Sequence, residues 1–175
     1  MRRAMYLMGV LDDSDIGWLA SHGTALRAPA GQILIREGQP LDSLFVVFEG
    51  QLRVTVGGKP IATLHAGEVV GEISLIDSRP PLATVTAMNN AHLLSVSKDL
   101  LKRKLDVDKK FAANFYRALA IFLADRLRTT TARLGYGSPT QDGEQDTGAE
   151  LGDDLMETVS LGTRRFDELL RRVSR

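Results

Sequence analysis

The sequence predicts a mainly β fold with flanking helices, and three observations support this prediction. From Leu26 to Ser97 the chain consists of short runs of Val, Ile, Leu and Thr separated by glycine turns, as in antiparallel hairpins of a sandwich or barrel. After Ser97 the hydrophobic residues recur every three or four positions, which indicates helices. The 175 residues are 43% hydrophobic, enough for one core. We therefore expect one domain with a tail.

A helix is expected first, over residues 11–20. Asp12, Asp13 or Ser14 can cap it, and Gly23 ends it. Strands follow over residues 32–35, 43–48, 51–56, 59–64, 83–88 and 92–96. Turn glycines separate them at Gly31, Gly38, Gly50, Gly57, Gly58 and Gly67. The first domain is expected to span residues 1–134, with its barrel over about 26–97.

Two helices are expected after the strands, a short one over residues 98–105 and a long one over about 108–134. Asp108 can cap the long helix. Its hydrophobic stripe consists of Phe111, Phe115, Ala118, Leu119, Phe122, Leu123, Leu127 and Leu134. Because this stripe is wide enough to touch both the barrel and a partner helix, we expect a homodimer through the long helix.

The last forty or so residues divide into two parts. Residues 135–160 are rich in Gly, Thr, Gln and acidic side chains, which predicts a flexible linker. Residues 161–175 predict a short amphipathic helix capped by Thr163. Its apolar face is formed by Phe166, Leu169, Leu170 and Val173. This face suits docking on the protein's own barrel, the other subunit or a separate protein.

Charge and composition exclude several classes of protein. Lys and Arg total 22, as do Asp and Glu, so the net charge is +0 and no overall field attracts nucleic acid or acidic membranes. The absence of cysteine excludes disulfides and thiolate metal sites. No signal-peptide segment or membrane-spanning run follows the basic N-terminus, so we expect a cytoplasmic protein.

The segments from Gly67 to Asp77 (GEVVGEISLID) and from Arg79 to Ala87 (RPPLATVTA) resemble the phosphate-binding cassette of cyclic-nucleotide-binding domains. The resemblance covers roughly residues 11–134, including the turn glycines and the long helix. It implies an eight-stranded jelly-roll barrel followed by a long helix, similar to the effector domain of the catabolite activator and FNR family. The DNA-binding domain that often follows is not expected here.

The chemistry of this segment fits a phosphodiester ligand. Gly71 allows the backbone to approach a ligand closely, and the turn from Glu72 to Ile76 presents N–H groups as a helix start does. The resemblance implies that Glu72 binds the ribose 2′-OH and that Ala83 and Thr84 contact the cyclic phosphate. The expected ligand-binding residues are Val70, Gly71, Glu72, Ile73, Ser74, Arg79, Leu82, Ala83, Thr84, Thr130 and Thr131.

One position departs from the family pattern. Where nucleotide-binding members have an arginine just before the small-residue pair, this chain has Pro81, which offers neither charge nor N–H donor. A charge-assisted hydrogen bond contributes about 1.5–3 kcal/mol, so its loss weakens binding roughly ten- to a hundredfold. Arg79 is the nearby cation that can substitute for it. In the long helix, Thr130 and Thr131 resemble the hydroxyl residues that meet the adenine base in the catabolite activator.

The sequence contains no assembled catalytic motif. His22, His65 and His92 are scattered singly, which does not fit the histidine-rich metal site of a cupin enzyme, and no nucleophile elbow or Walker loop is present. The residues after the long helix are too few and too acidic for a winged helix-turn-helix, so direct DNA binding is not expected.

The leading hypothesis is a non-enzymatic sensory module. It binds cAMP, cGMP or another cyclic nucleotide, a cyclic dinucleotide included, and signals through the long helix and the C-terminal tail. The alternative is a pseudo-receptor that no longer binds cyclic nucleotide and serves as a dimerisation or docking scaffold. Both hypotheses leave open a protein partner for the C-terminal helix, and neither includes a membrane.

Overall fold

The computed structural model describes residues 3–77, 79–133 and 153–173. Two helices precede the strands: α1 (Arg3–Val10) and α2 (Asp13–His22). The eight strands are β1 (Gly23–Ala28), β2 (Ile33–Ile35), β3 (Ser43–Glu49), β4 (Gln51–Val56), β5 (Lys59–His65), β6 (Val69–Val70), β7 (Thr84–Ala87) and β8 (Ala91–Ser97). A short helix, α3 (Ile73–Ile76), lies between β6 and β7, and α4 (Lys98–Val107), α5 (Lys109–Arg133) and α6 (Asp153–Val173) follow β8.

The strands form two four-stranded sheets in which all pairs are antiparallel. The order is β1-β8-β3-β6 in the first sheet and β2-β7-β4-β5 in the second. The expected mainly β jelly-roll fold with flanking helices is therefore confirmed, although the sheets face each other and do not close into one barrel. Strands β1 and β6 were not predicted.

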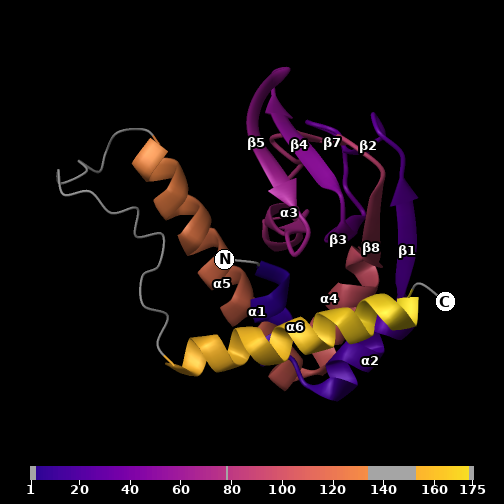
Figure 1. Ribbon diagram of the computed structural model, residues 1–175, viewed down its shortest axis with the longest axis vertical. Coiled ribbons are helices and arrows are strands. Elements are labelled where there is room, and N and C mark those ends of the chain that lie inside the picture. The colour runs from indigo at the N-terminus through magenta and orange to yellow at the C-terminus, as the bar shows by residue number, and fades with distance from the viewer. Residues whose placement is uncertain (1–2, 78, 134–152, 174–175) are drawn as a thin grey trace.

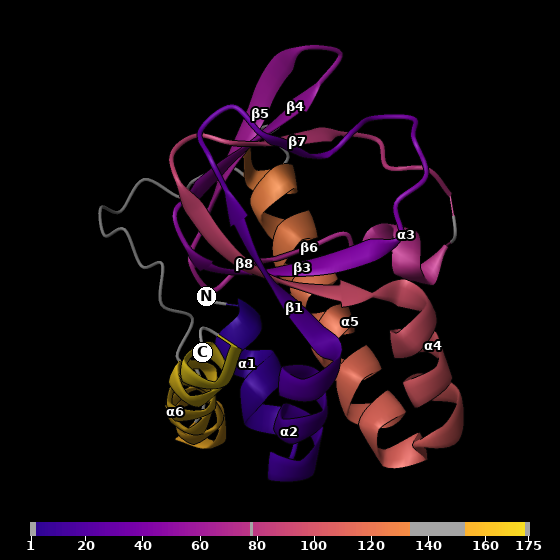
Figure 2. The ribbon, with the colours of Figure 1, turned by 90° about the vertical axis from the view of Figure 1, so that its right-hand side faces the viewer.

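Two hydrophobic clusters hold the sheets and helices together. The cluster between the sheets contains Phe45, Val47, Leu52, Val85 and Leu93. The alternate side chains of β3 and β8 face the helices, where they pack against residues of α1, α2, α5 and α6. Figure 2 shows α1, α2, α4 and α6 gathered below the sheets. The first sheet is thus covered on both faces, which explains why β3 reads as a continuous hydrophobic run.

Polar groups fix the ends of α2 and α5. Asp12 caps α2 in a capping box with Asp15, whose N–H donates to Asp12 Oδ1 at 3.0 Å. Asp108 caps α5, because its Oδ1 accepts from the N–H of Phe111 at 2.9 Å. Lys104 Nζ lies 3.3 Å from the buried Asp15 and 2.7 Å from Asp108. One cation of α4 therefore connects the starts of α2 and α5.

The C-terminal helix α6 lies against α1 in both views of the chain (Figures 1 and 2). Gly162 of α6 and Gly9 of α1 make the close approach possible. A Cβ on Gly162 would lie 1.6 Å from the Met5 carbonyl oxygen, and a Cβ on Gly9 would lie 2.1 Å from that of Thr158. The backbones of the two helices are therefore in contact where they cross.

Side chains of α6 complete this docking. The guanidinium of Arg165 donates to the carbonyl oxygens of Met8 and Gly9, both at 3.2 Å, and lies 2.7 Å from Asp13 Oδ1. Phe166 is buried, with its ring 5.3 Å from that of Phe48 on β3. Since these carbonyls belong to the last turn of α1, Arg165 satisfies groups that the helix leaves without partners.

The C-terminal helix is longer than the sequence indicated. It starts at Asp153, eight residues earlier than expected and inside the segment interpreted as linker. Thr163 is not its N-cap but a mid-helix residue whose hydroxyl donates to the Val159 carbonyl at 3.0 Å. The rest of the predicted linker, residues 135–152, lies outside the described residues.

Candidate functional site

The sharp turn between β6 and α3 forms the centre of the predicted site. β6 is held by pairing with β3, where Val70 lies opposite Phe45. Gly71 follows with φ +94°, and a Cβ there would lie 2.9 Å from the carbonyl oxygen of Ser43 and 3.0 Å from Leu41 Cδ2. Only glycine fits this conformation and this space. The turn therefore depends on Gly71.

Glu72 is one of the few buried charged residues in the described part of the chain, at 4% exposure. It precedes the first residue of α3, and its carbonyl oxygen accepts from the N–H groups of Leu75 and Ile76 at 3.1 and 3.3 Å. Its side chain does not cap the helix. The backbone of Glu72 is thus fixed by the first turn of α3, and its side chain is buried beside the turn.

Ser74 connects the turn to the helix that follows the sheets. Its hydroxyl donates to the Gly71 carbonyl at 3.3 Å and accepts a hydrogen bond from Lys98 Nζ, at the start of α4. Lys98 is 5% exposed, and burial lowers the pKa of its ammonium group. The sequence analysis did not identify Lys98, because a lysine at the start of a helix carries no signal of burial.

The loop from Asp77 to Thr84 places the other predicted residues. Arg79 is exposed and pairs with Asp77, with 2.8 Å between Arg79 Nε and Asp77 Oδ2. The backbone N–H of Arg79, and then its guanidinium, lower the pKa of the Asp77 carboxyl. The structure therefore pairs the cation expected to replace the missing arginine with its own neighbour in the loop.

Backbone contacts fix the far side of this loop. The carbonyl of Pro81 accepts from the N–H of Gly38 at 2.9 Å, and the hydroxyl of Thr84 accepts from the N–H of Glu37 at 3.1 Å. Ala83 is half-buried, whereas Leu82 is 81% exposed. Ile73 and Ile76 on α3 are also exposed. An exposed apolar surface therefore borders the turn.

The remaining predicted residues, Thr130 and Thr131, belong to the long helix. α5 packs against α1 and α4, and Figure 1 shows its last turns leading away from α3 and from the strands. Thr131 is exposed on these turns, and the side chain of Thr130 lies outside the described residues. The predicted residues 70–74 and 82–84 flank the loop, while the two threonines lie on α5.

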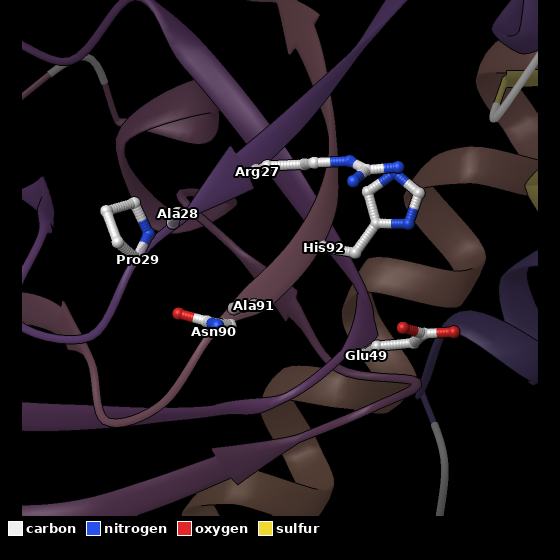
Figure 3. A pocket seen from close by; sticks show the side chains of 7 residues that line it. All are labelled: Arg27, Ala28, Pro29, Glu49, Asn90, Ala91 and His92. Carbon is white, nitrogen blue, oxygen red and sulfur yellow. The ribbon is translucent and has the colours of Figure 1, made fainter.

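A hollow lies away from this turn, where β1 and β3 end and β8 begins. It has a volume of about 380 Å³ and is lined by Arg27, Ala28, Pro29, Glu49, Asn90, Ala91 and His92 (Figure 3). His92 pairs in register with both Arg27 and Glu49, so the three side chains share one face of the sheet. None of the predicted ligand-binding residues lines it.

The described residues contain no group of three or more His, Asp or Glu side chains that could hold a metal ion. None of the helices in this part of the chain is long and apolar enough to cross a membrane.

Comparison with known proteins decides the family. Residues 25–108 match the model of the cyclic nucleotide-binding domain. The chain belongs to the cyclic nucleotide-binding domain family. The crystal structure of a cyclic nucleotide-binding domain from Methylobacillus flagellatus KT has a TM-score of 0.66 and 26% identity, covering 77% of each chain. The N-terminal domain of a transcriptional regulator from Streptomyces coelicolor A3(2) is 30% identical, with a TM-score of 0.57, and the match covers 79% of this chain and 94% of that one.

The curated relatives are longer proteins. A cGMP-dependent protein kinase of Caenorhabditis briggsae is 33% identical over 101 residues, which are 55% of this chain and 14% of the kinase. Across the first such relatives the match spans between 8% and 35% of their length. The resemblance drawn from the Gly67–Ala87 segment is thus confirmed for the family, and a regulatory role in signal transduction follows from it.

Proposed function

We propose that this chain is a non-enzymatic regulatory module that binds a cyclic nucleotide at the turn formed by Gly71 and Glu72. The observation that carries the proposal is the combination of a backbone turn that only glycine can form and a buried carboxylate beside it. The glycine lets a phosphodiester approach the backbone, and the carboxylate accepts from ribose hydroxyl groups. cAMP and cGMP are the first candidates.

Calorimetric titration with cAMP, cGMP and a panel of cyclic dinucleotides tests this function. A saturable heat with one of these compounds supports it. If no compound binds at millimolar concentration, the alternative holds, and the domain is a pseudo-receptor that serves as a scaffold. Pro81 and the pairing of Arg79 with Asp77 are the observations that favour this alternative.

Dimerisation through α5 is the second part of the proposal. Phe111, Phe115, Ala118, Leu119 and Phe122 face the core of the same chain. Another stripe recurs at helical spacing on a different side of α5: Tyr116 is 49% exposed, Ala120 is exposed, Leu123 is half-buried and Leu127 is 67% exposed. This second stripe is suited to a partner helix.

The output of the module is proposed to run through the helices. Lys104 joins α4 to the starts of α2 and α5, and α6 packs on α1 and α2. A movement of α4 against the sheets would therefore alter contacts in all the helices of this end of the molecule. The docked face of α6 is the one expected from Phe166, Leu169 and Leu170, which supports a role for α6 as the element that a ligand frees or retains.

A further inference from the structure

Lys98 is a buried cation that has no ion pair among the residues that the structure describes. It is 5% exposed, and within the described residues its ammonium group donates to a neutral partner, the hydroxyl of Ser74. It is the first residue of α4, where the helix dipole disfavours positive charge. Lysine is almost never fully buried without a counter-charge. Its position therefore costs stability in the structure as it stands.

Charged groups of several elements surround Lys98. Burial and the neighbouring Lys102 lower its pKa, whereas Asp42, Glu72 and Asp77 raise it. These three carboxylates belong to the segment before β3, to the turn and to the end of α3. The backbone N–H of Lys98 also donates to the Asp42 carbonyl at 2.9 Å. Lys98 is thus fixed at the point where α4, β3 and the turn meet.

The hydrogen-bond chain from Lys98 leads to the turn itself. Lys98 donates to Ser74, and Ser74 donates to the carbonyl of Gly71. The positive charge therefore lies one side chain away from the backbone of the turn. Pro81 supplies no cation, and Arg79 is exposed and paired with Asp77. Among these residues Lys98 is the one whose charge is buried, close to the turn and not neutralised in an ion pair.

We propose that Lys98 is a positioning residue for the anionic group of the ligand, supplying from the α4 side of α3 the positive charge that Pro81 cannot supply. The charge attracts an anion at the turn, and the hydrogen bond through Ser74 holds α3 in the conformation that receives it. The proposal rests on the proposed function for the identity of this anion, which is the cyclic phosphate of a nucleotide. It also explains why a costly buried lysine is present.

The test compares Lys98→Met with Lys102→Met, since Lys102 is an exposed lysine one turn along the same helix. Calorimetry with cAMP and cGMP at low and high salt should show at least a tenfold weaker affinity for Lys98→Met, with a flatter dependence on salt. Lys102→Met should bind within about twofold of the unaltered protein. Ser74→Ala, which keeps the charge, should lose less affinity than Lys98→Met.

Thermal unfolding separates this role from a merely structural one. Methionine keeps the aliphatic volume and removes the buried charge, so the unfolding temperature of Lys98→Met should not fall. Unchanged affinity for Lys98→Met, together with a lower unfolding temperature, would overturn the proposal and leave the proposed function intact.

Inorganic phosphate provides the readout that does not depend on a nucleotide. If cyclic nucleotides do not bind but phosphate raises the unfolding temperature of the unaltered protein and not of Lys98→Met, the proposed function fails and the role of Lys98 stands. If neither cyclic nucleotides nor phosphate bind, both proposals are wrong.

Discussion

Replacing Gly162 by alanine is predicted to disrupt the packing of α6 against α1. A Gly→Ala change inside a helix normally stabilises it by about 0.5–1 kcal/mol. Here the new Cβ would lie 1.6 Å from the carbonyl oxygen and 2.6 Å from the carbonyl carbon of Met5. Both atoms belong to the backbone of α1, so no change of side-chain rotamer can relieve the clash, and α6 must move outward.

The magnitude follows from the side chains that α6 buries. Leu169 is 0% exposed and Phe166 is 4% exposed in the cluster beneath the helices. Removing one buried Leu or Phe side chain from a core costs about 2–5 kcal/mol. We therefore expect Gly162→Ala to lower the free energy of unfolding by at least about 2 kcal/mol, and to make α6 sensitive to limited proteolysis.

Gly17→Ala is the matched control for this prediction. Gly17 lies in α2, and the nearest atom to its new Cβ would be Arg172 Nη1 at 3.7 Å, an ordinary contact. This control should be as stable as the unaltered protein or up to about 1 kcal/mol more stable. Urea denaturation of both variants provides the measurement. If Gly162→Ala is as stable as Gly17→Ala, the crossing of α1 and α6 is wrong.

Two further changes test the site and the proposed dimer. Pro81→Arg should tighten the binding of cAMP or cGMP roughly ten- to a hundredfold in calorimetry, because it restores a charge-assisted hydrogen bond. The control is Pro80→Arg at the exposed neighbouring position. Equal affinities for the two variants would show that Pro81 does not limit binding. Leu127→Asp should convert dimers into monomers in light scattering, because Leu127 is 67% exposed on α5, whereas Val107→Asp at the end of α4 should leave the dimer intact. If the unaltered protein is a monomer at tens of micromolar, the proposed dimer through α5 is wrong.

The strands and turns could be predicted because local chemistry specifies them. Gly31, Gly38, Gly50, Gly67 and Gly71 all have positive φ values, which glycine adopts at little cost. The spacing of these glycines is enough to predict where most of the turns between strands lie. Strand β6 has two residues and β1 begins directly after α2, so neither gives a hydrophobic alternation long enough to recognise.

The ends of the chain could not be predicted, because their structure depends on distant contacts. α1 is eight residues long and buries every side chain from Ala4 to Met8, so it has no polar face and no helical period. The sequence analysis took Thr163 as the cap of the last helix, but in the structure the helix continues through Gly162, where the backbone of Met5 approaches it. The sequence therefore placed the start of α6 too late.

The site was predictable as a segment but not as a set of contacts. The positions of Gly71 and Glu72 follow from one continuous stretch of sequence. The burial of Lys98, the pairing of Arg79 with Asp77 and the use of the Thr84 hydroxyl by Glu37 depend on how separate loops meet. The roles of the predicted ligand-binding residues remain predictions.

Amide chemical shifts during titration with cAMP or cGMP would test the central claim most directly. If the turn binds the cyclic nucleotide, the largest shifts should fall on Gly71, Ile73, Ser74 and Ala83, and Glu72→Ala should weaken binding by about 1–3 kcal/mol while leaving the rest of the spectrum unchanged. The hollow lined by Arg27, Asn90 and His92 is the internal comparison. Shifts confined to that hollow, or the same affinity in Glu72→Ala, would contradict the account.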